Sequence, residues 1–218
     1  IFKAFFLAGG PGSGKSFVTR NAFAGSGLKV INSDNAFERG IKKAGLSLKM
    51  PDSEADARDM VRARAKATTS NQLDLALMGR LGLIIDGTGR DYDKISYQVR
   101  ALKELGYDAH MIFVNTSLDV ALQRNQMRSR TIPEYIVTRS WNDVQSNIGK
   151  FQHLFGPSNI AIIDNNISDK ELTTQTMTKV SKAVNRMLNN PIKSYTAKRW
   201  IATELRNKRR KWKSLEKS

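Results

Sequence analysis

One eight-residue segment, 9–16, constrains this chain more than any other. Its letters, GGPGSGKS, fit the pattern G-x-x-x-x-G-K-[ST] and follow the apolar run Phe5–Ala8, which indicates a buried strand. Glycines adopt backbone conformations closed to other residues, so successive N–H groups can point inward around a phosphate. Residues 17–23 are expected to open a helix whose positive end faces the same anion. The segment therefore predicts a nucleotide-binding loop rather than an ordinary glycine-rich turn.

The residues of this loop have separate expected roles. Lys15 is expected to reach the β- and γ-phosphates of ATP, and the Ser16 hydroxyl is expected to hold Mg²⁺. The residues expected to contact the nucleotide are Gly10, Pro11, Gly12, Ser13, Gly14, Lys15, Ser16 and Phe17. ATP and Mg²⁺ are therefore the expected cofactors.

Four further apolar runs follow, separated by helical patterns. The five predicted strands are 2–8, 28–31, 81–85, 111–114 and 160–163. Short apolar strands that alternate with helices favour a parallel sheet covered on both faces. We therefore predict an α/β P-loop NTPase fold, a three-layer sandwich with a central five-stranded parallel sheet, a helical lid and a C-terminal basic helix. One domain is expected over 1–190 and a basic amphipathic extension over 191–218.

Three helical stretches of the domain have predicted limits. The stretch between 51 and 82 is either continuous or broken near 68–70. One helix is predicted over 133–151, because Pro-Glu suits a first turn. The last helix of the domain is predicted over 169–188, before Asn-Asn-Pro.

The charge of the chain points to an anionic partner. Lys and Arg number 36 against 20 Asp and Glu, which leaves +16 over 218 residues. Residues 191–218 carry ten basic and two acidic residues, and so half of this excess. Such a balance favours polyanions. With no cysteine and no apolar run long enough for a bilayer, we expect an intracellular, cytoplasmic protein without disulfides or a membrane partner.

Two aspartates follow predicted strands, at the edge where parallel sheets bind ligands. Asp34 is placed to accept the proton of an attacking hydroxyl; alternatively it assists a helix cap made by Asn35 and Glu38. Asp86 is the expected second acid, which holds a water on Mg²⁺ or orients the substrate hydroxyl. The alternative for Asp86 is a buried acid that caps the next turn.

Residues 117–130, here called the lid, are expected to form a helix with an apolar stripe. Arg124 and Arg128 lie beside that stripe. Like charges four residues apart repel, so an anion between them is a reasonable inference. Two such arginines would stabilise a migrating phosphoryl group and exclude water. The alternative is a solvated charged face.

These blocks together resemble the P-loop kinases typified by phage polynucleotide 5′-hydroxyl kinase, with the zeta-toxin kinases as more distant relatives. The matching blocks are the loop at 10–16, Ile31-Asn32-x-Asp34, Ile84-Ile85-x-x-x-Thr88, Arg124-Asn125-x-x-Arg128 and Ile132-Pro133-x-x-Ile136. The resemblance spans about residues 1–165. It implies that Asp34 is the general base, that the acid near Asp86 helps to place the substrate, and that Arg124 and Arg128 contact phosphates.

The chain departs from this family at two places. Phe37 stands where the family has a substrate-contacting arginine, and Arg39 is only nearby. The exit of the third strand, 86–90, has an extra glycine. A related phage group phosphorylates 5-hydroxymethyluracil in DNA, and an altered acceptor pocket would suit that substrate; a phage origin would fit as well. The expected substrate contacts are Asp86, Thr88, Arg90 and Arg39.

The basic extension is expected to form an amphipathic helix docked by an apolar edge. That edge comprises Ile201, Leu205, Trp212 and Leu215. Its cations would contact phosphates and its indoles would stack on bases. A membrane-surface helix and a solvated charged end are the alternatives.

The leading hypothesis is an ATP- and Mg²⁺-dependent kinase that phosphorylates a hydroxyl on DNA or RNA, at a 5′ end or on a modified base. One alternative is a small-molecule kinase that acts on a nucleotide sugar or a nucleoside. Another is a nucleic-acid-binding NTPase that has no phosphoryl acceptor.

Overall fold

The computed structural model describes residues 1–128, 130–166 and 170–216. The strands are β1 (Lys3–Ala8), β2 (Lys29–Ile31), β3 (Leu83–Asp86), β4 (Asp108–Asn115) and β5 (Ile160–Asp164). They pair in parallel in the order β2-β3-β1-β4-β5. This confirms the predicted five-stranded parallel sheet. Every predicted strand is present, and β4 begins three residues earlier than the apolar run indicated.

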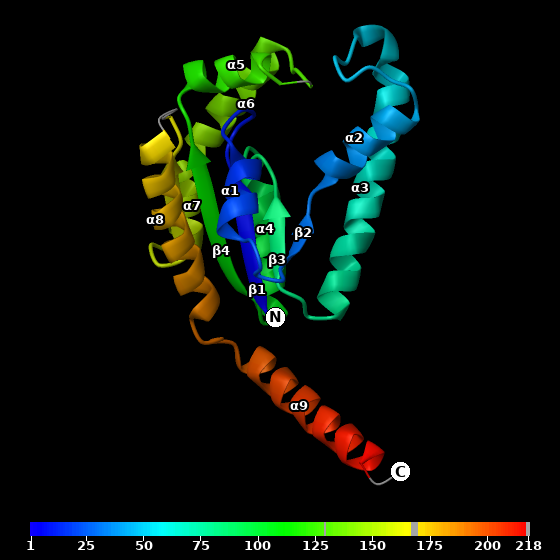
Figure 1. Ribbon diagram of the computed structural model, residues 1–218, viewed down its shortest axis with the longest axis vertical. Coiled ribbons are helices and arrows are strands. Elements are labelled where there is room, and N and C mark those ends of the chain that lie inside the picture. The colour runs from blue at the N-terminus through cyan, green and yellow to red at the C-terminus, as the bar shows by residue number, and fades with distance from the viewer. Residues whose placement is uncertain (129, 167–169, 217–218) are drawn as a thin grey trace.

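Helices cover both faces of this sheet (Figure 1). The helices are α1 (Lys15–Ala22), α2 (Ser33–Lys43), α3 (Ala55–Met78), α4 (Tyr92–Glu104), α5 (Leu118–Gln126), α6 (Glu134–Ser146), α7 (Ile148–Phe155), α8 (Lys170–Asn189) and α9 (Tyr195–Leu215), with a 3₁₀ turn, η1 (Asp52–Glu54). α1 and α8 pack on one face, and α4, α6 and α7 pack on the other. The molecule therefore has the expected three layers.

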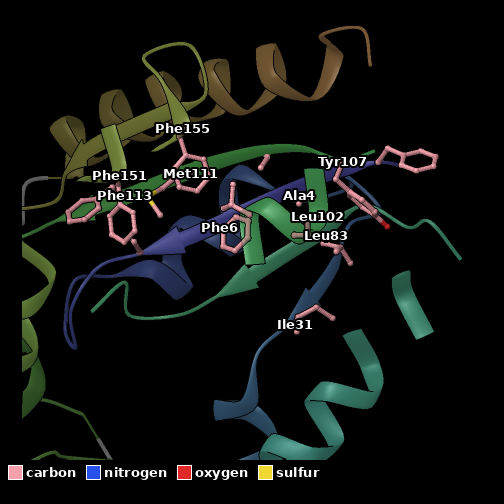
Figure 2. Packing of buried hydrophobic residues seen from close by; sticks show 14 of the residues in the cluster. Ala4, Phe6, Ile31, Leu83, Leu102, Tyr107, Met111, Phe113, Phe151 and Phe155 are labelled. Carbon is pink, nitrogen blue, oxygen red and sulfur yellow. The ribbon is translucent and has the colours of Figure 1, made fainter. Parts of the chain in front are cut away.

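The central strand β1 shows why both faces are apolar. Phe5 and Leu7 belong to the cluster with α1 and α8, whereas Ala4, Phe6 and Ala8 belong to the cluster on the opposite face. This alternation follows from the two-residue period of a strand. Figure 2 shows the second cluster, where the Phe6 ring lies 5.7 Å from that of Phe155 on α7. Burial on both faces fixes β1, and with it the loop that follows.

A helical arm stands beside β2 at the edge of the sheet (Figure 1). We use "the arm" for residues 33–78, which contain α2, η1 and α3. Phe37, Ile41 and Ala65 form a small buried cluster between α2 and α3, separate from the two clusters on the sheet. The outer part of the arm is therefore held together by its own core, whereas Ala76 near the end of α3 packs into a cluster on the sheet.

Two helical limits differ from those expected. α3 is continuous through 68–70, where the hydroxyls of Thr68 and Thr69 donate to the carbonyls of Arg64 and Ala65, one turn earlier. The single helix predicted over 133–151 is two helices, α6 and α7, which meet at Asn147. Asn147 donates from Nδ2 to the carbonyls of Gly89 and Arg90, at 3.2 and 2.9 Å. This contact with a distant segment accompanies the break.

The last helix of the domain, α8, ends one residue beyond its predicted limit, and residue 169, its predicted start, lies outside the described residues. Within the parts of the chain that the structure describes, no helix has the length and apolar character to cross a membrane.

Helix α9 is docked only at its beginning. Ala197 is fully buried, and the Trp200 ring lies 5.5 Å from that of Phe2. Leu205 and Trp212 are 51% and 65% exposed, so the expected docking by these two residues is wrong. The helix runs away from the sheet, which leaves these side chains no surface to cover (Figure 1). The side chain of Leu215, also expected on this edge, lies outside the described residues.

Candidate active site

The loop after β1 requires glycine at specific positions. Gly12 and Gly14 have φ values of 80° and 90°, in the left-handed region that glycine adopts without strain. A Cβ atom at Gly12 would lie 2.5 Å from the carbonyl oxygen of Ala121 in α5. Any side chain there would push the lid away from the loop.

Free backbone donors gather where this loop enters α1. The N–H groups of Gly14, Lys15 and Ser16 have no hydrogen-bond acceptor among the described residues, and Gly14 offers no side-chain cap. Unpaired N–H groups at a helix N-terminus form an anion-binding site together with the helix dipole. The loop therefore fits the polyphosphate of a nucleotide.

The loop is fixed from the ends of two neighbouring strands. The Ser13 carbonyl accepts hydrogen bonds from Asn165 Nδ2 at 2.7 Å and from Thr116 Oγ1 at 3.4 Å. The Trp141 indole in turn donates to the Thr116 carbonyl at 2.7 Å. Thr116 follows β4 and Asn165 follows β5, so the sheet itself positions the loop.

Lys15 lies folded back over the loop. Its Nζ donates to the carbonyls of Gly9 at 2.5 Å and Gly10 at 3.3 Å. Burial lowers the pKa of Lys15, while the carboxylates of Asp86 and Asp34 act in the opposite direction. A buried ammonium with only carbonyl partners would gain from a phosphate.

Asp86 lies at the end of β3 and faces the start of the arm. Its Oδ2 accepts a hydrogen bond from Asn32 Nδ2 at 2.6 Å. Burial raises the pKa of Asp86, and the charge of Asp34 adds to this rise. The charge of Lys15 and the hydrogen bond from Asn32 lower the same pKa. Asn32 was not among the predicted site residues, although its place two residues before Asp34 suits a helix cap.

Asn32 is in fact the residue that caps α2. Its side chain accepts the N–H of Asp34 at 2.7 Å. The alternative capping box of Asn35 and Glu38 is not formed; Glu38 pairs with Lys42 at 2.9 Å instead. The Asp34 carboxylate is therefore not used as the cap.

Asp34 lies between the loop and the arm. Its side chain is 61% exposed, and Oδ1 is 3.5 Å from Nη2 of Arg130. Its charge influences Lys15 and Asp86 on the loop side and Arg62 on the arm side. Asp34, Asp86 and Lys15 thus form one electrostatic group at the carboxyl edge of the sheet.

The two predicted lid arginines have different surroundings. Arg124 donates from Nη1 to the Asn165 carbonyl at 2.9 Å, beside the end of β5. Arg128 is exposed, and its charge acts on Lys15. Their shared contact with a phosphate stays a prediction.

The loop-flanking residue Phe17 is 44% exposed and lines a shallow pocket with Asn165 and Met177 of α8. Its free volume is about 10 Å³, close to that of one water molecule and far too small for a nucleotide base. The contact between Phe17 and a bound nucleotide therefore stays a prediction.

The remaining expected substrate contacts are dispersed. The Thr88 carbonyl accepts the Gly9 N–H at 2.8 Å, which ties the exit of β3 to the loop. Arg90 lines an open groove with Arg139 and Asp143. Arg39 is exposed on α2. Among the described residues, no hydrogen bond or ion pair joins Asp34 to Arg39 or Arg90.

Few side chains that could bind a metal ion are described near the loop. Within the described residues, no group of three or more His, Cys, Asp or Glu side chains could hold an ion. Mg²⁺ commonly takes one or two protein ligands and completes its shell with phosphates and water. Ser16 and Asp86 fit that sparse arrangement.

The sheet order, the glycine-rich loop and the free amides define a P-loop nucleotide-binding protein with the kinase-like three-layer fold. A family model confirms the class: AAA_33, described as an AAA domain, matches residues 5–150, and the chain belongs to this family. None of the curated proteins compared with the chain matches it.

Solved structures share the fold at low sequence identity. A candidate kinase from Chloroflexus aurantiacus is 17% identical, with TM-score 0.58 over 85% of this chain and 97% of the other. A gluconokinase from Sinorhizobium meliloti is 15% identical, with TM-score 0.52 over 87% and 95%. The PezAT toxin–antitoxin structure from Streptococcus pneumoniae is 16% identical, with TM-score 0.54 over 85% and 87%.

Proposed function

We propose that this protein is an ATP- and Mg²⁺-dependent kinase that transfers the γ-phosphate to a hydroxyl of a nucleic acid. The observation that carries the proposal is the position of Asp34. Its carboxylate shares one electrostatic group with Lys15 of the loop and borders a cluster of cations on the arm. A base between a phosphate site and a second basic surface suits transfer between two bound substrates.

Each residue has a specific task in this reaction. The N–H groups of Gly14, Lys15 and Ser16 hold the phosphates of the donor, and the Lys15 ammonium moves from its loop carbonyls to the β- and γ-oxygens. Asp34 accepts the proton of the attacking hydroxyl. Arg124 and Arg128 neutralise charge on the transferred group, and Arg124 exchanges its hydrogen bond to the Asn165 carbonyl for one to the phosphate. Mg²⁺, held by Ser16 with Asp86, would neutralise the phosphates.

The nucleic-acid acceptor is supported by the charge of the molecule. Half of the +16 net charge lies in 191–218, and the outer part of α9 is exposed and basic. The cations of such a helix can contact phosphates, and the release of counterions from the nucleic acid favours this binding. The 5′-hydroxyl end and a hydroxymethylated base, such as 5-hydroxymethyluracil in DNA, are the two acceptors proposed.

A small-molecule acceptor is the second candidate, because a gluconokinase shares the fold. A transfer assay with γ-labelled ATP separates the two. It would offer 5′-hydroxyl DNA, 5′-hydroxyl RNA, hydroxymethyluracil-containing DNA and UDP-sugars side by side. Label on an oligonucleotide supports the proposal. Label on sugar nucleotides alone, or phosphate release without any labelled acceptor, contradicts it.

The base is tested by Asp34→Asn, which keeps the size of the side chain. We expect transfer to fall at least about 100-fold, with ATP affinity within a few-fold of wild type. Asp74→Asn, an exposed carboxylate on α3, is the matched control and should retain full activity. Unchanged turnover in Asp34→Asn would exclude Asp34 as the base.

The outer part of α9 is tested without disturbing its docked beginning. Four exposed cations would be changed to Gln: Arg206, Lys208, Arg209 and Arg210. If all four cations contact phosphates, we expect the magnitude of the slope of log K against log salt for DNA binding to decrease by about 3.6, since each lost phosphate contact contributes about 0.9. The control changes four exposed cations elsewhere: Lys29, Lys94, Arg100 and Lys103. An equal effect in both variants would contradict a specific role for α9.

A further inference from the structure

Two arginines from different elements meet at one aromatic ring of the arm. The Cζ atom of Arg62, on α3, lies 4.0 Å from the centroid of the Phe37 ring. The Cζ atom of Arg130, from the segment between α5 and α6, lies 5.8 Å from the same centroid. Phe37 on α2 is only 1% exposed and belongs to the core of the arm. One fixed ring therefore contacts two guanidiniums that come from different parts of the chain.

These guanidiniums have unused hydrogen-bonding capacity. Within the described residues, Arg62 forms no hydrogen bond or ion pair, and Arg130 has the single ion pair with Asp34 at 3.5 Å. The Arg130 side chain is only 11% exposed. A guanidinium has five N–H donors, and a largely buried one gains from further acceptors.

Electrostatics points the same way. Burial lowers the pKa of Arg62, and the charges of Arg130 and Arg58 lower it further, while Asp34 and Asp59 act in the opposite direction. Among the described residues, only Asp34 forms an ion pair with either Arg62 or Arg130, so both guanidiniums gain from a further anion. Planar guanidiniums bind phosphate through paired N–H···O bonds, which favours a phosphate over a less regular acceptor.

We propose that Arg62 and Arg130 form a phosphate subsite for the acceptor, which holds the phosphate next to the hydroxyl that Asp34 deprotonates. The inference rests on the proposed function and specifies its substrate: a hydroxyl that has a neighbouring phosphate. Because Arg130 comes from the lid and Arg62 from the arm, the subsite is complete only when these two parts lie together.

The test compares two acceptors that differ in one charge. A 5′-hydroxyl dinucleotide with its natural phosphodiester and the same dinucleotide with an uncharged methylphosphonate would be titrated into the full chain by calorimetry. We expect the charged form to bind at least about tenfold more tightly, as charge-assisted hydrogen bonds allow. Arg62→Gln should reduce this preference to about twofold or less, and Arg62→Lys should restore part of it.

Arg64→Gln is the matched control. Arg64 is exposed and lies two residues further along α3, about 200° around the helix from Arg62, so its loss should leave the preference intact. The methylphosphonate form should bind wild type and Arg62→Gln equally, which shows that the arm stays folded. Equal binding of both forms by wild type, a preference that persists in Arg62→Gln, or equal loss of both forms would overturn the subsite.

Two further measurements distinguish the source of the bound phosphate from the kinase activity. If a nucleoside 3′-monophosphate binds as tightly as the charged dinucleotide, the subsite accepts the phosphate of a free nucleotide. If it binds more weakly, the subsite prefers the phosphate of a polynucleotide backbone. Both results support a phosphate subsite. If the preference is present but labelled phosphate never reaches an acceptor, the proposed kinase activity fails and the subsite stands.

Discussion

The two sides of the candidate active site are built in different ways. On the donor side, the loop 9–16 presents free backbone N–H groups, and the ends of β4 and β5 hold the loop in place. On the acceptor side, the exposed Asp34 of the arm pairs with Arg130, and the outer part of the arm has a core of its own. The donor side therefore depends on backbone geometry, whereas single substitutions can reshape the acceptor side.

The largest effect should come from the one side chain that the donor side requires. Lys15→Met is expected to lower the transfer rate at least about 1000-fold, because a charge aimed at the transferring phosphoryl group is lost. Initial rates with γ-labelled ATP measure this. Lys29→Met, an exposed lysine on β2, should be close to wild type. Transfer within tenfold of wild type in Lys15→Met would mean that the amides alone suffice.

The separate core of the arm can be broken by Phe37→Ala. Removal of a buried phenyl ring costs about 3–5 kcal/mol. If the arm has its own core, amide hydrogen exchange should rise in α2 and α3 while the amides of the sheet stay protected. Tyr97→Ala, at a 68% exposed position on α4, is the control and should leave exchange unchanged. Equal loss of protection in the arm and the sheet would contradict independent cores.

The cores should also differ in their response to acid. Burial, with Lys3, lowers the pKa of His110 from 6.5 to about 4; Asp108 opposes this, and Lys193 adds to it. His110 lies in β4 against the Phe5 ring, with a centroid distance of 5.0 Å. Because the unfolded chain binds this proton more readily, the stabilisation is complete above pH 6.5 and is lost as pH falls toward 4. The loss should reach about 3 kcal/mol.

His110→Phe removes this titration and keeps an aromatic ring against Phe5. Urea unfolding of both proteins between pH 7 and pH 4 should show wild type losing more stability than the variant. His153→Gln, at an exposed position on α7, should follow wild type. Parallel curves for wild type and His110→Phe would show that the buried histidine does not set this pH dependence.

The comparison of the two sides also explains what the sequence could predict. The loop depends on glycines at fixed spacing, and the strands of the sheet depend on short apolar runs. Because both are local patterns, the sheet and the loop were predictable. β4 was predicted too short because Asp108 and His110 interrupt the apolar pattern, although both pair with β1.

Features that depend on distant contacts were not predictable in this way. The break at Asn147 accompanies hydrogen bonds to Gly89 and Arg90, nearly sixty residues earlier. The pairing of Arg62 with Phe37 crosses two helices, and neither residue stood among the predicted site residues. The roles assigned to Asp34, Arg124 and Arg128 stay predictions until the transfer assays are done.

The docking of α9 beside Phe2 sets a minimum length for any acceptor that uses both basic surfaces. Phe2 precedes the six residues of β1, and the phosphate loop follows them, so the two places are about 20 Å apart. A duplex that reaches from one to the other needs at least about six base pairs. Oligonucleotides below that size would contact only one of the two places, and their turnover should not depend on the charge of α9.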